Sequence, residues 1–473
     1  MSSQKKSIFV APDGQNLLMT FILVSSLFLL WGFCNGMIDG MDKLFQVELK
    51  LSKSQSASVQ FAHYLGYFLM SVPAGWLASK LGYKGGIIVG LLIVALGGFW
   101  FIPATRISAM VHTGAVSANM AFVAFLTGVC VIATGLTFLE TIANPYTTVL
   151  GDQQYAATRI NLAQSCNGVG WILGPAVGSM FFYGKDAAGQ STGSETLYIP
   201  YVGVAVTVIV LAVVFFFSKI PDIKTTDDYH LDDSMPGVSH SIWKHPHFVL
   251  AVVAQFLYVA AQAGIFSFFI NYMTEELPAI PSSWESSLDS IGANAGFLQN
   301  WLRGWFETNP HGVLAMSNKG AANLASLGSI CFLIGRFSGA GILRKYSAHK
   351  VLGLYAVANV VVTILVFLKL GWISAFCVFL SYFFMSIMFP TIFALGIYGL
   401  GARAKKASAF IVMAIMGGAL LPKLMGWVAD EWDMSRGFIV PAVCFAFVAF
   451  YGFNWSKFSK ADSLTGVRTM AGH

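Results

Sequence analysis

Charged residues are scarce in this chain of 473 residues. Asp, Glu, Lys and Arg make up 11% of it, whereas average soluble domains are about 25% charged. Hydrophobic residues make up 56% and include 40 phenylalanines and 12 tryptophans, beside 47 glycines. A water-soluble fold has no means of hiding so much apolar surface. The composition therefore excludes an ordinary soluble domain and is typical of a polytopic membrane protein.

Cysteines and catalytic motifs are also few. The six cysteines lie within apolar stretches and form no C-x-x-C pair, so we interpret them as small hydrophobic residues rather than as disulfide or metal partners. The sequence has no nucleophile elbow, no metal-ligand cluster and no nucleotide-binding loop, which argues against an enzyme with a metal or cofactor. The net charge of +6 is spread over short loops, so nucleic acid is not an expected partner.

Long apolar runs fill most of the chain. A helix needs about 20 apolar residues to cross a bilayer, and lipid forces each backbone group to find its hydrogen-bond partner within the segment. We therefore predict an all-α fold with about twelve spanning helices. Their ranges are 17–41, 55–80, 85–103, 118–148, 160–183, 197–219, 247–273, 317–342, 350–369, 372–399, 406–428 and 437–456.

The distribution of Lys and Arg predicts the orientation and the division of the chain. More of these residues fall in loops that share a side with the two termini, so the positive-inside rule places both termini in the cytoplasm. The polar segment 218–246 is predicted to be a cytoplasmic linker between a six-helix bundle at 1–217 and another at 247–473. The first apolar run is too long for a signal peptide, and we expect it to remain as a span.

Two weak internal repeats support this division. "GWLASKLGYK" from Gly75 resembles "GILRKYSAHK" from Gly341, and "IANPYTTVLG" resembles "IMFPTIFALG" at the corresponding place in the second half. We interpret the loops of the first pair as a latch on the cytoplasmic side, although simple anchoring by positive charge would explain their lysines equally. The residues of this predicted latch are Gly75, Lys84, Gly341, Arg344 and Lys350.

Two carboxylates stand inside predicted spans. A charge at the centre of a bilayer costs about 2.5–3.5 kcal/mol on insertion scales, and an ionisable residue there indicates a pathway or a proton relay. Glu140 has apolar sequence for more than a helical turn before it, and its alternative is a buried ion pair with Arg336 or Lys423. Asp39 lies late in the first span; it faces the interior, or it marks the outer helix end, where Asp42 and Lys43 are interpreted as interface residues.

Neutral polar residues accompany these carboxylates on the same or facing helices. Amides, carboxylates and phenols hydrogen-bond hydroxyl groups, whereas an anionic ligand would need more cations than Arg336 and Lys423. His63 is either a proton carrier or a packing residue, and Lys423 either binds ligand or extends to the interface. The pattern suits a neutral polyhydroxylated ligand. The candidate binding residues are Asn35, His63, Glu140, Asn144, Gln164, Asn167, Tyr258, Gln262 and Lys423, with Gln255 on the same stripe as the last tyrosine and glutamine.

Several segments resemble the fucose permease family of sugar–cation symporters, within the major facilitator superfamily. The resemblance rests on "NGMIDGM", "FLETIANPYTTVLG", "RINLAQSCNGVG", "VAQFLYVAAQAG" and "MSIMFPTIFALGI", and it extends over nearly all spans. It implies twelve transmembrane helices in two six-helix halves related by pseudo-two-fold symmetry. It also implies that Asp39 takes part in proton uptake and that Glu140 couples sugar recognition to protonation.

The same resemblance implies alternating-access import of a neutral hexose such as fucose, glucose or galactose, with proton coupling. His63, Met388–Phe389 and Lys423 depart from the family pattern, so an N-acetylhexosamine is an alternative cargo. Sodium coupling is an alternative because Asn35, Asp39 and Glu140 offer oxygen ligands, and a proton-driven drug exporter is the alternative from another class. We expect a monomer in contact with lipid, as a multi-pass protein of a bacterial inner membrane.

Overall fold

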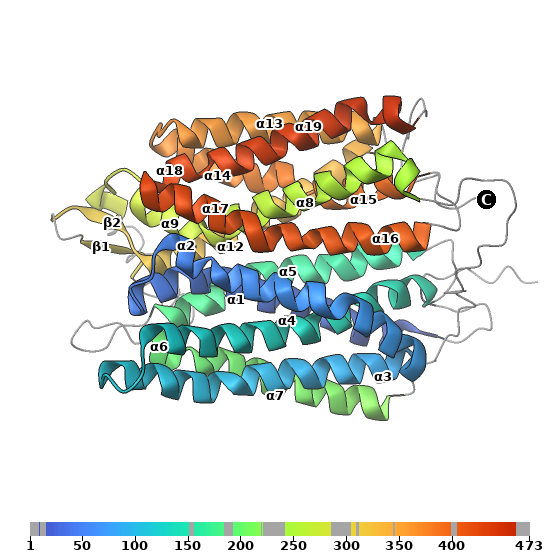
Figure 1. The fold of residues 1–473 in the computed structure, drawn as a ribbon, viewed down its shortest axis with the longest axis horizontal. Helices are drawn as coiled ribbons and strands as arrows, with labels where there is room; N and C mark the ends of the chain where they lie inside the picture. The colour runs from blue at the N-terminus through green and yellow to red at the C-terminus, as the bar shows by residue number, and fades with distance from the viewer. Residues whose placement is uncertain are drawn as a thin grey trace, which may run out of the picture.

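Long helices run side by side along one axis in this computed structural model (Figure 1). It describes residues 9, 16–150, 156–183, 193–218, 220, 242–284, 304–308, 312–343, 346–398 and 404–459. Each of the predicted spans is helical, which confirms the all-α fold. Within these ranges 10 helices are long and apolar enough to cross a membrane. The predicted spans 55–80 and 160–183 are helical but fall outside that apolar criterion.

The N-terminal group of helices occupies the lower part of Figure 1. The predicted spans 55–80 and 85–103 join in one element, α3, which changes direction at Gly82, where φ is 70°. Glycine adopts this left-handed conformation without a steric penalty, so the chain turns there without a loop. The group consists of α1 (Leu18–Glu48), α2 (Lys53–Ser56), α3 (Ser58–His112), α4 (Ala118–Val149), α5 (Ala156–Phe182), α6 (Gly193–Thr196) and α7 (Tyr198–Phe217).

The C-terminal group occupies the upper part of the same view and contains several interrupted helices. Its helices are η2 (Ile242–Lys244), α8 (Pro246–Ser267), α9 (Phe269–Glu275), α12 (Asn318–Leu343), α13 (Ala348–Phe367), α14 (Trp372–Met385), α15 (Met388–Ile397), α16 (Ala404–Met413), η4 (Ala414–Met416), α17 (Gly417–Glu431), α18 (Met434–Gly437) and α19 (Ile439–Ser459). The predicted linker 218–246 lies mostly outside the described residues, so the domain boundaries stay a prediction.

A small β-hairpin caps one end of the helices. Strand β1 (Phe306–Thr308) pairs antiparallel with β2 (Leu314–Met316), and Phe306 faces Met316. The pattern of apolar runs did not predict this hairpin, because each strand is only 3 residues long. We call the end that carries α2, α6, β1 and β2 the hairpin end, and the opposite end, where α8 begins and α19 ends, the terminal end (Figure 1).

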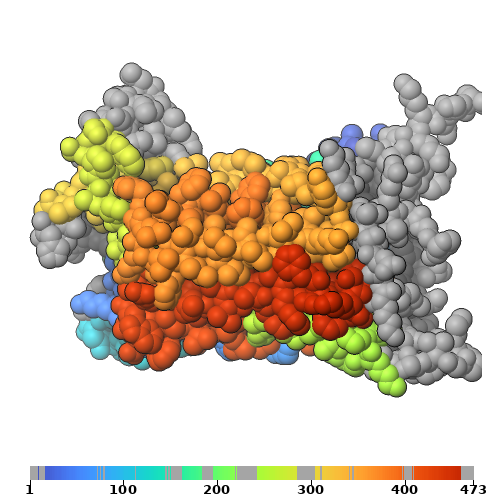
Figure 2. Space-filling view, turned by 90° about the horizontal axis from the view of Figure 1, so that it is seen from above, coloured from blue at the N-terminus to red at the C-terminus, as the bar shows by residue number. Residues whose placement is uncertain are grey.

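Each group of helices has a hydrophobic core of its own. One buried cluster runs from Leu17 to Ile220, and a second runs from Ala251 to Trp455 and also takes in Ala57 of the N-terminal group. Large apolar side chains are also exposed on the outside; Figure 2 shows one face of the molecule, formed largely by the C-terminal group. Phe376 and Val443, both of the C-terminal group, are 63% and 65% exposed. Soluble proteins rarely expose so much apolar surface, and lipid is its natural solvent.

Glycines bring α1 and α5 into direct backbone contact. A Cβ atom on Gly170 of α5 would lie 2.3 Å from the carbonyl oxygen of Leu29, and one on Gly174 would lie 2.6 Å from that of Phe33. Gly32 of α1 faces Asn167 equally closely, at 2.1 Å from its carbonyl oxygen. Small residues allow this approach, which replaces the hydrophobic effect as a source of helix association in lipid. The helices α1 and α5 therefore form one tightly packed pair.

Enlarging Gly170 should destabilise this pair. Gly170→Val places side-chain atoms where the α1 backbone lies, so overpacking should cost about 1–3 kcal/mol and lower the midpoint of thermal unfolding in detergent. Gly203→Ala in α7 is the matched control, because no atom lies within 4 Å of the added Cβ. Alanine favours a helix over glycine by about 1 kcal/mol, so the control should unfold at the wild-type temperature or above. Equal midpoints for Gly170→Val and wild type would contradict the packing described here.

Candidate functional site

Tyr64 lies where the two groups of helices meet. Its hydroxyl is within electrostatic range of Asp39 on α1, Glu140 on α4 and Tyr258 on α8. A Cβ atom on Gly418 of α17 would lie 2.3 Å from its ring. The side chain of Tyr64 is thus surrounded by helices of both groups, and it brings together residues that lie far apart in the sequence.

An aromatic cluster surrounds Tyr64 on the N-terminal side. The ring of His63 lies 5.0 Å from the rings of both Tyr64 and Tyr67, measured between centroids. The indole nitrogen of Trp31 donates a hydrogen bond to the Tyr67 hydroxyl. His63 is buried, and its Nδ1 atom has no hydrogen-bond partner in the described part of the chain. His63 therefore packs among rings, as one of its two interpretations has it, and its role in binding stays a prediction.

Glu140 lies within this polar neighbourhood and is half-buried. It is within electrostatic range of Tyr67 as well as Tyr64, and none of the ion pairs found among the described residues includes it. Neither predicted alternative partner reaches it. Arg336 donates its Nε–H to the Ser386 carbonyl oxygen at 3.4 Å, and Lys423 lies over the ring of Phe61 at 5.0 Å.

Asp39 lies inside α1 rather than at its end, because the helix continues as far as Glu48. Its Oδ1 atom accepts a hydrogen bond of 3.0 Å from Nε2 of Gln60 on α3. Asp39 also lines a small cavity between the groups, together with Ser179 and Tyr183 on one side and Phe266 and Ile270 on the other. This position fits the interior interpretation of Asp39.

The prediction that Asp42 lies at the membrane interface did not anticipate its burial. Asp42 is completely buried, although α1 runs past it to Glu48. Its companion in that prediction, Lys43, does lie at the hairpin end, where it forms an ion pair.

Two predicted ligand residues direct their polar groups toward backbone. The amide nitrogen of Asn167 donates to the Phe28 carbonyl oxygen at 3.3 Å. The Tyr258 hydroxyl donates to the Met385 carbonyl oxygen at 3.0 Å. That carbonyl lies where the predicted span 372–399 breaks into α14 and α15, so Tyr258 and Arg336 both satisfy backbone groups that the interruption releases.

The other predicted amides have different surroundings. Asn35 and Gln255 are buried, and in the described residues the Oδ1 atom of Asn35 and both amide atoms of Gln255 have no hydrogen-bond partner. Gln164 and Gln262 are half-buried. Asn144 belongs to α4, but its side chain lies outside what the structure describes. The binding roles of all these residues stay predictions.

The predicted latch is described only in part. Nζ of Lys84 donates to the carbonyl oxygens of Phe216 and Ser218, at 2.7 and 3.0 Å, so it caps the end of α7. Gly75 and Gly341 belong to α3 and α12, and Lys350 is exposed on α13. Arg344 lies outside the described residues. The contacts of Lys84 lie within one group of helices and do not test a latch between the groups.

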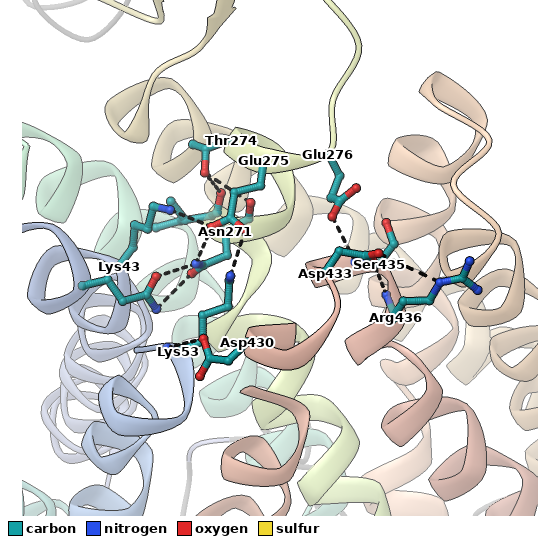
Figure 3. Close-up of polar contacts among 12 residues, drawn as sticks. Lys43, Lys53, Asn271, Thr274, Glu275, Glu276, Asp430, Asp433, Ser435 and Arg436 are labelled. Atoms are coloured by element: carbon teal, nitrogen blue, oxygen red, sulfur yellow. Dashed lines mark hydrogen bonds and ion pairs between the residues drawn. The ribbon is translucent and has the colours of Figure 1, made fainter. Parts of the chain in front are cut away.

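Sequence reasoning missed a polar clasp at the hairpin end (Figure 3). Glu275 of α9 pairs with Lys43 at 3.0 Å and with Lys53 at 3.1 Å, so the C-terminal group meets two cations of the N-terminal group. Asn271 donates to Oε1 of Gln46 at 2.5 Å. We call these five residues, together with Asp430, the hairpin-end clasp.

Asp430 completes the clasp through the backbone. Its two carboxylate oxygens accept hydrogen bonds from the amide nitrogens of Lys53 and Ser54, at 2.9 and 2.8 Å. These amides open α2, so the carboxylate of α17 satisfies donors that a helix start leaves free. The loop between α1 and α3 is thereby fastened to the C-terminal group.

A further bond between the groups links α5 to α12. The Ser179 hydroxyl lies 2.6 Å from Oδ1 of Asn323, and Ser179 also lines the cavity at Asp39. The rings of Trp171 and Phe266 meet edge to face across the same interface, with centroids 5.3 Å apart. Together with the clasp, these contacts close the hairpin end over the central site.

The sequence of this chain is similar to those of known transporters. A family model described as Major Facilitator Superfamily matches residues 17–395. The L-fucose-proton symporter of Escherichia coli is 32% identical over 458 residues, which cover 93% of each chain. A glucose/galactose transporter of Brucella abortus is 31% identical and covers 91% of this chain and 92% of its own.

Solved structures agree with these relatives. The crystal structure of the transporter FucP in its outward conformation is 32% identical, with a TM-score of 0.61, and covers 93% of this chain and 99% of its own. The inward-open xylose transporter XylE of E. coli has a TM-score of 0.63 at 11% identity and covers 96% of this chain and 99% of its own. The second likeness concerns the fold alone.

The clasp should favour the closed hairpin end, and Glu275→Gln tests this. The variant loses both ion pairs, each worth about 1 kcal/mol or less at a partly exposed site, so the ratio of closed to open protein should fall by roughly fivefold for 1 kcal/mol. Spin labels at Lys50 and Glu431, in a background without the native cysteines, report the separation as a distance distribution. Arg436→Gln is the control, because its 4.0 Å pair with Asp433 lies within the C-terminal group. Unchanged distances in Glu275→Gln would contradict the clasp.

The same pairs predict how the clasp responds to pH. Burial acts to raise the pKa of Glu275, but Lys43, Lys53 and Asn271 outweigh it and hold the pKa below its usual value, which is about 4.3. A lowered pKa gives stabilisation that is complete above the usual value and is lost as the pH falls through the folded one. The difference between wild type and Glu275→Gln should therefore stay constant between about pH 5 and 8. A difference that shrinks within that range would mean that Glu275 titrates there.

Proposed function

This chain belongs to the Major Facilitator Superfamily, and from that premise we propose that it imports a neutral hexose by proton-coupled symport with alternating access. The observation that carries the proposal is the pair of carboxyls, Asp39 and Glu140, that meet neutral aromatic and amide groups at the junction of the two helix groups. The family transports solutes and is not a class of enzymes. We further propose that the protein works as a monomer in a bacterial inner membrane, with both termini in the cytoplasm.

The chemistry of the junction favours a sugar over a charged or lipophilic cargo. Hydroxyl groups are recognised by amides and carboxyls, which both accept and donate hydrogen bonds when the acid is protonated. Ring faces such as those of Trp31 and Tyr64 suit the apolar C–H faces of a pyranose. Arg336 and Lys423 lie beside carbonyl and aromatic groups, and no ion pair found among the described residues joins either of them to Asp39 or Glu140. The relatives named for fucose, glucose and galactose fit this choice.

Proton coupling follows from the two carboxyls. An ionised carboxylate is costly in a closed, water-free site, so the helix groups close most readily when the acids are neutral. Asp39 takes a proton from the hairpin side, and Glu140 binds the sugar hydroxyls beside Tyr64. Protonation and sugar binding then each favour closure of the hairpin end, and release on the terminal side empties the site. Uptake against a gradient is driven because protonation and sugar binding each favour the same rearrangement.

Reconstitution into liposomes tests the function directly. Labelled fucose, glucose, galactose and N-acetylhexosamines are presented with an imposed pH gradient, with a sodium gradient, or with neither. We expect uptake of one hexose class that rises with the pH gradient and is accompanied by alkalinisation outside. Uptake driven by sodium alone would overturn proton coupling. Transport of lipophilic cations without any sugar would overturn the whole proposal.

Asp39→Asn should separate transport from coupling. The amide keeps the shape of the side chain and its contact with Gln60, but it cannot bind or release a proton. Sugar counterflow between equal concentrations should persist, while accumulation driven by a pH gradient should be abolished. Glu431→Gln, an exposed carboxyl at the hairpin end, serves as control and should accumulate sugar normally. Full accumulation by Asp39→Asn would remove this residue from coupling.

Glu140→Ala should weaken sugar binding itself. Hydrogen bonds to a charged or ionisable partner are worth about 1.5–3 kcal/mol each, so the dissociation constant should rise by roughly 10- to 150-fold. Sugar-induced quenching of tryptophan fluorescence, with Trp31 near the site, measures that constant. Glu140→Gln retains part of the hydrogen bonding and should bind more tightly than Glu140→Ala. Wild-type affinity in Glu140→Ala would rule out a ligand role for Glu140.

A further inference from the structure

Asp42 is a second carboxyl on α1 for which the proposed mechanism has no use. Its exposed fraction is 0%, and neither of its oxygens has a hydrogen-bond partner in the described part of the chain. It lies one helical turn after Asp39, which by contrast accepts a hydrogen bond from Gln60. A buried acid with no partner is rare and calls for a physical explanation.

Among the described residues, the groups around Asp42 include no free cation. Asp39 faces it on α1, Gln60 is close to both acids on α3, and Tyr183 approaches from the end of α5. The Tyr183 hydroxyl donates to the Gly40 carbonyl oxygen at 2.7 Å. Lys43 is next in sequence, but its Nζ lies 3.0 Å from Glu275. The described surroundings of Asp42 are thus two neutral polar groups and another acid.

These surroundings decide the charge of Asp42 in the closed structure. Removing a carboxylate from water without a compensating partner costs several kcal/mol, and the second acid one turn away adds repulsion. A neutral carboxyl avoids both costs and loses only its hydrogen bonds to water. Asp42 therefore carries a proton while the hairpin end is closed.

The position of Asp42 on α1 links its protonation to the opening and closing of the hairpin end. Asp39, Asp42 and Gln46 lie at intervals of three and four residues, so they form one stripe of the helix. Asp39 lines the cavity between the groups, and Gln46 bonds to Asn271 in the clasp. Both neighbours of Asp42 on this stripe thus face the C-terminal group. Separation of the groups at the hairpin end admits water along the stripe, where an ionised carboxylate is solvated.

We propose that Asp42 is a second proton-binding residue of this transporter, which takes up a proton from water at the hairpin end each time that end closes. The proton adds to the carboxylate of the hydrated, open form and is carried into the buried, closed form. Closure at the hairpin end thereby takes up one proton on Asp42, in addition to those that the proposed mechanism assigns to Asp39 and Glu140. This inference rests on the proposed proton-coupled transport and adds a site to it.

Spin labels at Lys50 and Glu431 test the proposal without any sugar. In the wild type the closed fraction should rise on acidification, because each carboxyl that is protonated on closure contributes one proton to the linkage. Asp42→Asn is permanently neutral, so it should close at higher pH, with a steepness lower than that of the wild type by about one proton. Asp39→Asn should behave alike, and in the double variant the steepness should fall by about two protons. An Asp42→Asn curve with wild-type midpoint and steepness would overturn the proposal.

Two further measurements separate this role from a structural one. Infrared difference spectra of the closed protein should show a protonated-carboxyl band that Asp42→Asn removes and Glu431→Gln retains. Asp42→Leu should fold as well as Asp42→Asn, because a neutral acid without partners offers nothing that these side chains lack. Misfolding of both variants would overturn the proposal, since it would reveal an ionised and structurally bound Asp42.

Sugar counterflow distinguishes failure of this inference from failure of the proposed function. Asp42→Asn should retain counterflow in liposomes at the wild-type rate at acidic pH. If wild type transports a hexose and the two labelled proteins titrate identically, only the second proton site is refuted. If wild type transports no sugar, the function proposed above fails, while the titration of closure still reports on Asp42.

Discussion

Lipid offers neither hydrogen bonds nor solvation of charge, and this constraint organises the molecule. Apolar side chains can remain on the outside, where Phe376 and Val443 face the surroundings. Polar side chains must instead meet one another, and they do so where the two helix groups face each other. Tyr64, Asp39 and Glu140 belong to three different helices, yet they converge at that junction. The junction thus brings together the residues of the proposed transport site.

The closed hairpin end has a different chemistry from the junction below it. Its clasp uses ion pairs and a backbone-capping carboxylate, which are partly exposed and keep their charge. Asp39 and Asp42 of α1 lie deeper, and none of the ion pairs found among the described residues includes either of them. Charge is therefore compensated by fixed partners near the surface, and in the proposed mechanism by protons in the interior. This division allows one end to close firmly without trapping uncompensated charge at the site.

Hydropathy alone predicted the helices well, because twenty apolar residues in lipid have few alternatives to a helix. It predicted their ends less well. Asp42 is a charged residue at the end of an apolar run, which is typical of an interface residue. Whether it is buried depends on how neighbouring helices pack against it, and the sequence pattern does not specify that packing. The clasp was missed for the same reason, since Lys43 and Glu275 are separated by more than two hundred residues and each resembles an ordinary loop charge.

The central residues show the same limit. The isolated carboxyl of Glu140 was recognisable from the apolar sequence around it. The sequence also showed too few cations within the predicted spans to bind an anionic ligand. The directions of Asn167 and Tyr258 were not, because both residues serve the backbone of neighbouring helices. Gln60 was overlooked, although a polar residue three positions before His63 in an apolar run is a recognisable signal. The hydrogen bond from Gln60 to Asp39, however, depends on how α1 and α3 pack and is not apparent from the sequence.

The glycine contacts between α1 and α5 have a mechanical consequence. Backbones that touch at Gly32 and Gly170 have no side-chain layer that would let one helix slide past the other. The two helices must therefore move as one rigid body. Because α1 carries both Asp39 and Lys43, any tilt of the α1–α5 pair displaces the buried Asp39 and the clasp residue Lys43 together. A movement of α1 and α5 would thus couple the junction of the two helix groups directly to the hairpin end.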